Sequence, residues 1–249
     1  MKFIKTYRSP NFNFRSKNSK IKYLILHYTA ILSDEVALKY LCNQSNKVSS
    51  HYLIDKSGFI FNLVDDKFRA WHAGKSYWRK KRDINSNSIG IEICNSGHHL
   101  NFENYTLDQI VSISKLLTYL KKKYSVKCEN ILGHSDISPY RKIDPGEKFP
   151  WLKLSKQKIL RFPEIVSEKV SNQIEIKLKL VSKFSKKKRT LYMLAKIGYN
   201  TKPSILSNKN FFTLIKAYQM HYRSSFVTGY LDDKTYEIIK SHYNLLLTD

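Results

Sequence analysis

The sequence is poor in the residues that cross-link a chain or carry it through a membrane. It holds only three cysteines, Cys42, Cys94 and Cys128, among 249 residues. An odd number without a close pair argues against a disulfide scaffold, so we expect all three to be buried as small hydrophobic side chains. No apolar run approaches the roughly 20 residues that span a bilayer, and we therefore expect no transmembrane segment.

The N-terminus lacks the marks of a secretory signal. Residues 1–11 carry positive charge but contain neither an apolar core nor a small-residue cleavage site. A lipid-attachment cysteine is also missing there. Export is thus not encoded in a form that these residues show, and the location of the protein stays open.

Acidic residues are also scarce. Asp and Glu number 20 against 44 Lys and Arg, which gives a formal net charge of +24 at pH 7. Such a balance can favour nucleic acid, anionic lipid or an acidic cell wall. However, the lysines are spread from end to end, and the densest cluster, Lys186–Arg189, lies near a predicted domain junction. Charge alone describes association rather than chemistry, so we expect no nucleic-acid partner.

Several common enzyme motifs are absent. The chain has no HExxH helix, no GxSxG elbow and no glycine-rich loop that would cradle phosphates. These absences remove support for the HExxH metalloproteases, the serine hydrolases of the GxSxG type and the nucleotide-binding enzymes.

What is present divides into a larger α/β domain and a small helical one. The length suits one well-cored domain plus a second, smaller unit. We predict a polar, irregular N-terminal arm at 1–19, a catalytic domain at 20–155, a connecting segment at 156–185 and a three-helix module at 186–249. Within the connecting segment, residues 174–180 alternate in hydropathy but have no evident hairpin partner.

The predicted catalytic domain contains strand and helix signals in alternation. Apolar β-forming runs occupy 21–26, 51–55, 59–64 and 89–94, and Lys56-Ser57-Gly58 is typical of a hairpin turn. One helix begins at the Ser33 cap, with Val36, Ala37, Tyr40 and Leu41 as its expected apolar face. A longer helix follows the capping box at Thr106, with apolar residues at helical spacing from Ile110 to Leu120.

The residues most indicative of function lie in the loop from Gly133 to Gly146. This loop places His134, Lys142 and Asp144 close together between proline and glycine residues. His27 stands at the end of another apolar strand, where sites in α/β sheets gather. Catalytic zinc takes three protein ligands from His, Asp, Glu and Cys. His27, His134 and Asp144 satisfy that rule if their strands are neighbours, although the spacing alone is a weak signal.

Two further segments allow two interpretations each. Glu92 lies on a strand whose other residues on that face are small, so it belongs either to a solvated face or to a cleft, where it could move protons. The segment from Arg69 to Arg79 concentrates aromatic rings, His72 and cations. It either lines a site or forms a surface loop held by its tryptophans.

Five blocks in order resemble one enzyme family. They are Leu26–Ala30, Ser49–Ile54, Ala70–Gly74, Asn87–Glu92 and Gly133–Ile137. Over about residues 20–155 the chain resembles the type 2 N-acetylmuramoyl-L-alanine amidases, which also include the phage lysozyme-amidases and the peptidoglycan recognition proteins. Because the phage branch carries cysteine as the third ligand, Asp144 points to the AmpD/AmiD-like bacterial branch.

The resemblance implies a fold, a cofactor and a reaction. It implies a mixed central β-sheet flanked by helices, one catalytic Zn²⁺ on His27, His134 and Asp144, Glu92 as general base and acid, and Lys142 as the cation for the transition state. We expect hydrolysis of the amide between N-acetylmuramic acid, or its 1,6-anhydro form, and L-alanine in peptidoglycan or muropeptides. Substrate contacts are expected at His51, Trp71, His72 and Arg79.

The C-terminal module also resembles a known unit. Ala217–Arg223 and Thr228–Thr235 are similar to the helical peptidoglycan-binding domain that follows the catalytic domain in related enzymes. An appendage that only stabilises the fold is the alternative. The resemblance suggests the bacterial cell envelope, whereas the missing export signal leaves the cytoplasm possible. A peptidoglycan-binding protein without catalysis is the alternative function, and the oligomeric state is not indicated.

Overall fold

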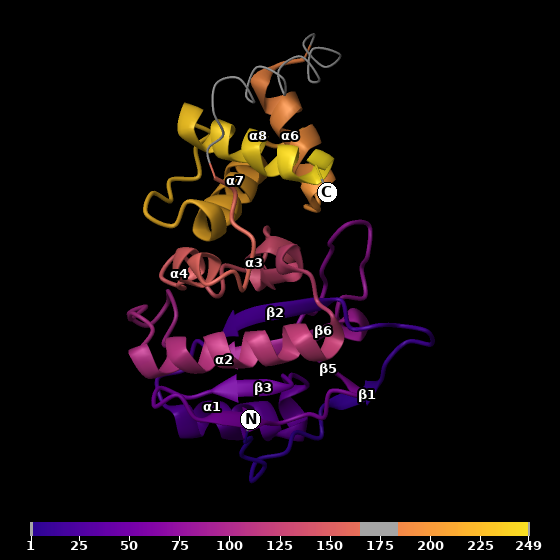
Figure 1. The fold of residues 1–249 in the computed structure, drawn as a ribbon, viewed down its shortest axis with the longest axis vertical. Helices are drawn as coiled ribbons and strands as arrows, with labels where there is room; N and C mark the ends of the chain where they lie inside the picture. Colours follow the sequence, from indigo (N-terminus) through magenta and orange to yellow (C-terminus); the bar gives the residue numbers. More distant parts are fainter. Residues whose placement is uncertain (1, 165–183, 249) are drawn as a thin grey trace.

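The centre of the molecule is a mixed β-sheet. The structure is a computed structural model that describes residues 2–164 and 184–248. Within these residues five strands pair in the order β4-β3-β6-β2-β7 (Figure 1). β2 (Tyr23–Tyr28) runs parallel to both β6 (Ser88–Ile93) and β7 (Ile131–Gly133). β3 (Tyr52–Ile54) is parallel to β6, and β4 (Ile60–Asn62) closes the edge as an antiparallel hairpin partner of β3.

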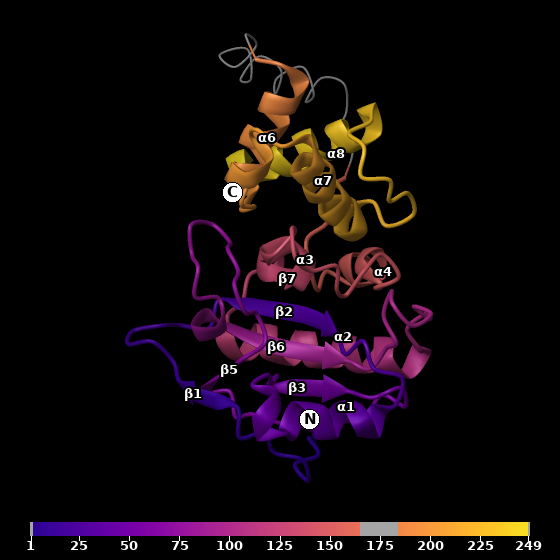
Figure 2. The same cartoon turned by 180° about the vertical axis from the view of Figure 1, so that it is seen from behind.

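Helices cover both faces of this sheet, which confirms the predicted fold class. α2 (Leu107–Tyr124) lies across one face, as the two opposite views show (Figures 1 and 2). Its buried leucines and Ile113 pack against the three isoleucines of β6. α1 (Asp34–Cys42) packs on the other face, where Ala37, Leu38 and Leu41 join Leu53 and Cys94 in a separate cluster. Strand β6 therefore turns its isoleucines towards the α2 layer, while Ser88, Gly90 and Glu92 lie on the opposite face.

Local signals in the sequence explain how these elements begin and turn. Ser33 caps α1, and Thr106 forms the predicted capping box with Gln109 at the start of α2. Gly58 in the β3–β4 turn has φ of +80°, and a Cβ there would lie 2.7 Å from the carbonyl oxygen of Asp108. Glycine is thus required both for the turn and for the approach of α2.

Two predictions about local packing were partly wrong. In α1, Val36 and Tyr40 are exposed rather than buried, because the buried stripe of the helix passes through Leu38. Cys94 is buried as predicted, but Cys42 and Cys128 are only partly buried, and all three are free thiols.

The N-terminal arm is more ordered than predicted. β1 (Phe12–Phe14) pairs with β5 (Phe68–Ala70) in a small antiparallel sheet. Upstream, the backbone of Ile4 exchanges hydrogen bonds with that of β4. The prediction of an irregular arm missed these pairings because both partners lie more than 50 residues away in the sequence.

Short helices separate the sheet from the C-terminal region. α3 (His134–Ile137) follows β7 directly, and α4 (Trp151–Lys156) comes after the loop. Beyond them the described residues form α6 (Lys186–Ile197), α7 (Asn208–Tyr222) and α8 (Asp233–Thr248), the predicted three helices (Figures 1 and 2). Short 3₁₀ turns occur at 44–46, 85–87, 128–130 and 202–204. The alternating segment predicted at 174–180 lies outside the described residues.

The C-terminal helices share one hydrophobic cluster with the sheet. Ile25 of β2 and Ile137 of α3 belong to the same cluster as Leu194, Leu214 and Ile239. The helices are thus packed onto the face of the larger domain. Among the described residues, no helix is both long enough and apolar enough to cross a bilayer.

A fully buried carboxylate joins the two parts. Asp136 in α3 accepts hydrogen bonds from the backbone N–H of Gly133 (2.7 Å) and from the hydroxyl of Tyr199, and its Oδ2 lies 2.7 Å from Nδ1 of His221. The His221 ring stacks on Trp151, with centroids 3.6 Å apart. Asp136 is therefore bound simultaneously by its own helix and by two C-terminal side chains.

Replacing His221 with phenylalanine should destabilise this contact without emptying the space. The variant keeps a ring against Trp151 but leaves a buried carboxylate oxygen with one partner fewer, which typically costs about 1–3 kcal/mol. Urea unfolding measures the loss. Leu206→Ala, at an exposed side chain, is the control and should change stability by no more than about 0.5 kcal/mol. Equal stabilities for the two variants would contradict a structural role for the Asp136 contact.

Buried histidines should make stability depend on pH. Burial, with the nearby Arg15 charge, lowers the pKa of His51 to about 4, and burial, with His221 nearby, lowers that of His242 to about 3. Below the unfolded-state pKa of about 6.5 the unfolded chain binds more protons than the folded one, so stability falls as the pH drops from about 6.5 towards 4. Thermal unfolding across this range measures the fall, and His242→Gln should make it shallower. A midpoint that stays constant from pH 7 to 4.5 would contradict this.

Candidate metal centre

The parallel pairing of three strands brings the predicted ligands together. His27 is the next-to-last residue of β2, and its partner in the register of β6 is Glu92. On the other side of β2, Gly133 of β7 pairs with Leu26, so His134 follows at the same edge. The strands that precede His27 and His134 are thus neighbours in the sheet, as a shared site requires.

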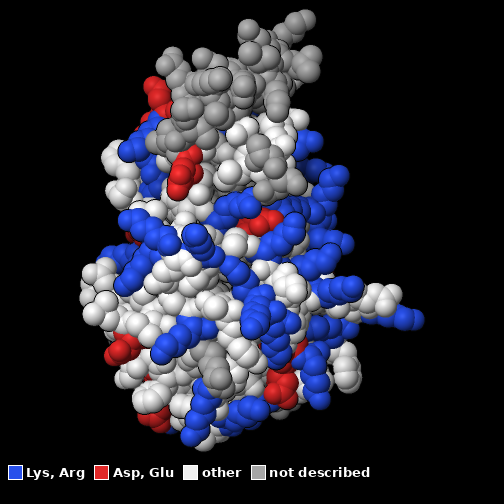
Figure 3. Space-filling view, in the orientation of Figure 1, with Lys and Arg blue, Asp and Glu red and all other residues white. Residues whose placement is uncertain are grey.

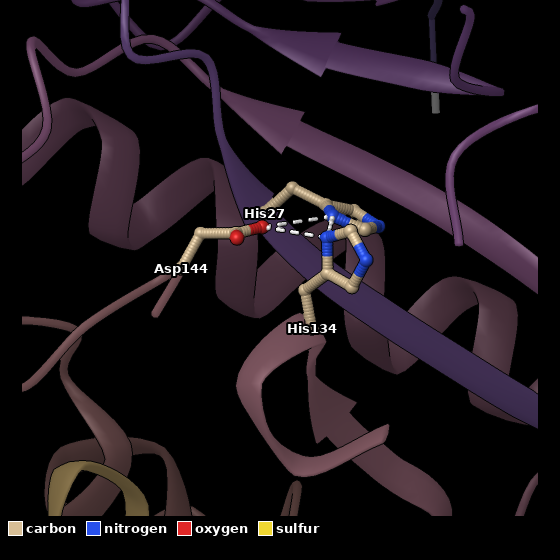
Figure 4. A group of neighbouring side chains, drawn as sticks. All are labelled: His27, His134 and Asp144. Atoms are coloured by element: carbon tan, nitrogen blue, oxygen red, sulfur yellow. Dashed lines mark hydrogen bonds and ion pairs between the residues drawn. The ribbon is translucent and has the colours of Figure 1, made fainter. Parts of the chain in front are cut away.

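Side-chain atoms from three segments converge at this edge (Figure 4). Nδ1 of His27 lies 2.9 Å from Nδ1 of His134, and each is 3.0 Å from Oδ2 of Asp144. All three residues are buried. The backbone holds the arrangement, because the N–H of Ser135 donates to the carbonyl oxygen of Asp144 at 2.9 Å.

The loop that carries Asp144 is anchored at its far end by aromatic residues. Phe149 and Trp151 are buried, and their rings pack against each other. The hydroxyl of Tyr105 donates to the carbonyl oxygen of Pro145 at 2.7 Å. The carboxylate is thus presented by a loop that is held on both sides of it.

The donor set has the chemistry of a cation site. Nε2 of His134 lies 3.1 Å from the carbonyl oxygen of Ala73 and 3.2 Å from Nη2 of Arg141. When this nitrogen donates to the carbonyl oxygen, the neutral ring carries its lone pair on Nδ1. Arg141 donates to the same carbonyl and to that of Lys75. Asp144 adds a carboxylate oxygen, and His27 adds a third acceptor when its proton lies on Nε2. A carboxylate and two imidazoles within 4.8 Å of one another match the ligands that zinc takes.

Burial and neighbouring charges set the ionisation of His27 and Asp144. Burial and the neighbouring His134 lower the pKa of His27 to about 4. For Asp144, burial acts to raise the pKa, but His134 and His27 outweigh it, and the pKa is lowered. Both groups therefore present lone pairs at neutral pH.

Glu92 lies in the same cavity, so its strand face is not solvated. The cavity measures about 290 Å³ and is also lined by all three clustered residues, Lys142 and His72. Burial and then the Asp144 carboxylate raise the pKa of Glu92 well above its usual value, and the Lys142 charge opposes the shift. Among the described residues, its Oε2 has no hydrogen-bond partner. A buried carboxyl group is thus available to exchange a proton with a ligand.

Three of the four predicted substrate contacts lie elsewhere. His51 is fully buried, and its Nδ1 accepts the backbone N–H of Gly90 at 3.0 Å. Trp71 donates from its indole to Asn13, and Arg79 donates to the carbonyl oxygen of Ile197 at the end of α6. These three do not line the cavity, so substrate binding by them stays a prediction that the cavity does not support. His72 does line it, with Nδ1 3.0 Å from Nε2 of His27.

The cavity has walls that the sequence did not indicate. The cavity is also lined by Tyr40 and Leu41 of α1 and by Asn46 and Val48 after it. Tyr40 had been predicted as a core residue because it fits helical spacing. The sequence around Tyr40 and Asn46 looks the same whether these side chains line a cavity or lie on an exposed surface.

Known proteins of one family match this chain over most of its length. A family model described as N-acetylmuramoyl-L-alanine amidase matches residues 17–147. The N-acetylmuramoyl-L-alanine amidase AmiD of Escherichia coli is 32% identical over 234 residues, which cover 89% of this chain and 82% of that protein.

Solved structures extend the likeness to the whole fold. AmiD in complex with anhydro-N-acetylmuramic acid-L-Ala-D-γ-Glu-L-Lys superposes with a TM-score of 0.78 at 30% identity, covering 94% of each chain. AmpDh3 of Pseudomonas aeruginosa, in complex with anhydromuramic pentapeptide, gives 0.77 at 30% identity and covers 95% of this chain and 94% of its own. Both structural matches span nearly the whole of this chain. The chain belongs to the N-acetylmuramoyl-L-alanine amidase family.

Proposed function

We propose that the protein is a zinc-dependent amidase that cleaves the bond between the lactyl group of N-acetylmuramic acid, or its 1,6-anhydro form, and L-alanine. The observation that carries this is the convergence of His27, His134 and Asp144 on one point of a cavity that also contains Glu92 and Lys142. Family membership makes the reaction an amide hydrolysis. The zinc dependence and the individual roles are our inference.

The residues present fit zinc better than the other common divalent ions. Two imidazole nitrogens and one carboxylate oxygen form a three-ligand set of the kind that leaves a fourth position for the reaction. Magnesium and calcium prefer sets made of oxygen atoms. When bound, zinc would supply a Lewis acid that polarises the scissile carbonyl group and makes water more acidic.

Glu92 is proposed to carry the proton. Its carboxylate takes a proton from the attacking water, and the resulting carboxyl group gives that proton to the amine nitrogen of L-alanine as the amide bond breaks. The raised pKa of the buried side chain favours the second step, because it makes Glu92 hold the proton until the leaving amine can take it. Glu92 lines the same cavity as the three proposed zinc ligands.

Lys142 is proposed to stabilise the developing negative charge. Its side chain lines the same cavity as Asp144, and its charge acts to lower the pKa of both His27 and Glu92. A fixed cation near the carbonyl carbon stabilises the tetrahedral oxyanion more strongly than it stabilises the uncharged substrate.

The substrate class is inferred from the relatives. AmiD and AmpDh3 were solved with anhydromuramic peptides, and this chain matches both over nearly its full length. A muropeptide or a peptidoglycan segment is therefore the expected ligand. The C-terminal helices are proposed to help hold the polymer, as their resemblance to a peptidoglycan-binding domain suggests. Lys and Arg side chains are scattered over the face drawn in Figure 3, and we propose no nucleic-acid partner.

A non-catalytic peptidoglycan-binding protein is the second candidate, and Glu92 separates the two. In Glu92→Gln, zinc should stay bound while the release of stem peptide from a defined anhydro-muropeptide, followed by mass spectrometry, falls by about 10²–10⁴-fold. Glu35→Gln, at an exposed position of α1, is the matched control and should keep the wild-type rate.

The same assay tests the metal. A chelator should stop the release by wild-type protein, and added zinc should restore it. Release that persists after complete removal of zinc would contradict the metal mechanism. No release by zinc-loaded wild-type protein would favour the binding protein instead, and a Glu92→Gln rate close to wild type would remove Glu92 from proton transfer.

A further inference from the structure

A line of hydrogen-bonding groups runs from the metal centre into the interior. Nε2 of His27 lies 3.0 Å from Nδ1 of His72, and Nε2 of His72 lies 3.1 Å from the hydroxyl oxygen of Ser88. That hydroxyl lies 2.7 Å from the carbonyl oxygen of Ile84. His27, His72 and Ser88 are all buried. The line therefore begins at a proposed zinc ligand and ends at a backbone carbonyl group.

The direction of each hydrogen bond follows from its last member. The Ile84 carbonyl oxygen can only accept, so the Ser88 hydroxyl donates to it and must itself accept from Nε2–H of His72. A neutral His72 has a single N–H group, so its Nδ1 carries a lone pair. That lone pair accepts Nε2–H of His27, which leaves Nδ1 of His27 unprotonated and facing His134 and Asp144.

Two other observations show that the His72 ring is held in this orientation. A Cβ built on Gly90 would lie 2.3 Å from Cγ of His72, so the ring rests directly on the backbone of β6 where no side chain intervenes. Asn85 accepts the backbone N–H groups of His72 (3.2 Å) and Ala73 (2.8 Å) through one oxygen. The ring is thus held by its contact with Gly90 of β6, and the backbone that carries it is held by Asn85.

The neutral form of His72 is consistent with its surroundings. Its ring is buried between the rings of His27 and His51, at centroid distances of 5.1 and 5.7 Å. Within residues 2–164 and 184–248 no carboxylate is in hydrogen-bond contact with it. A cationic ring there would lack a counter-charge, and it would direct an N–H group at the nitrogen of His27.

From this geometry we propose that His72 is a positioning residue for the metal centre. Together with Ser88 it holds the proton of His27 on Nε2 and so keeps the Nδ1 lone pair directed at the cation. The inference builds on the proposed zinc site but concerns the chain's own protons. It replaces the predicted substrate contact of His72 with a role behind the ligand.

The position of the proton can be read directly in the metal-free, full-length protein. Long-range ¹H–¹⁵N correlation spectra distinguish the two neutral forms of each histidine. In wild type we expect the proton on Nε2 of both His27 and His72, and in Ser88→Ala we expect a mixture of forms at His72. A wild-type proton on Nδ1 of His27 would overturn the proposal, and so would an unchanged His72 spectrum in Ser88→Ala.

A pair of substitutions with similar shape tests the consequence for zinc. His72→Asn keeps an acceptor near the former Nδ1, whereas His72→Leu does not. Zinc affinity, measured by competition with a chromogenic chelator, should fall about 10–100-fold in the leucine variant and much less in the asparagine variant. If His72 only fills space, leucine should match or exceed asparagine, and this result would overturn the proposal.

Two controls separate this inference from the proposed function. His242→Asn replaces another buried histidine, located in α8, and should leave zinc affinity unchanged even if it lowers stability. Zinc binding that is absent in the wild type would contradict the proposed metal mechanism, while the tautomer spectra would still decide the proton position at His27. Zinc binding in the wild type with equal affinities in both His72 variants would overturn the present inference alone.

Discussion

The site depends on the parallel pairing of β2 with β6 on one side and with β7 on the other. Because the register places Glu92 beside His27 and ends β7 next to Leu26, three chemical groups from distant parts of the chain arrive at one edge. A shift of one residue in either pairing would turn His27 or Glu92 to the opposite face of the sheet, into the apolar layer under α2. The isoleucines of β6, buried in that layer, oppose such a shift.

A second constraint on the site is that the polar side chains buried around it need hydrogen-bond partners. The buried polar groups near this edge form one line of contacts, from the Ile84 carbonyl oxygen through Ser88 and His72 to His27 and His134. On the far side of His134, Asp136 ties the same short helix to the C-terminal helices. The cation site is therefore held between a polar line in the large domain and a polar contact with the small one.

Most strands and helices around the site could be predicted from the sequence, because each follows a local pattern of apolar and capping residues. The apolar runs and the punctuated loop from Gly133 to Gly146 indicated an α/β domain and gave only a weak signal for a metal site. The mixed sheet and the ligand set were implied by the resemblance of five sequence blocks to the amidase family. The roles of His51 and Arg79 could not be predicted in this way. Their partners, Gly90 and Ile197, lie 39 and 118 residues away, and a polar residue in a motif looks the same whether it faces a ligand or binds the backbone. The pairing of the N-terminal arm was missed for the same reason.

The most direct test of the account is a crystal structure of the zinc-loaded protein with diffraction recorded on both sides of the zinc absorption edge. We expect one strong anomalous peak, bonded to Nδ1 of His27 and Nδ1 of His134 at about 2.0–2.1 Å and to a carboxylate oxygen of Asp144 at about 2.0–2.2 Å. A peak bonded through Nε2 of either histidine, a peak at another set of residues, or no peak in zinc-loaded crystals would contradict it.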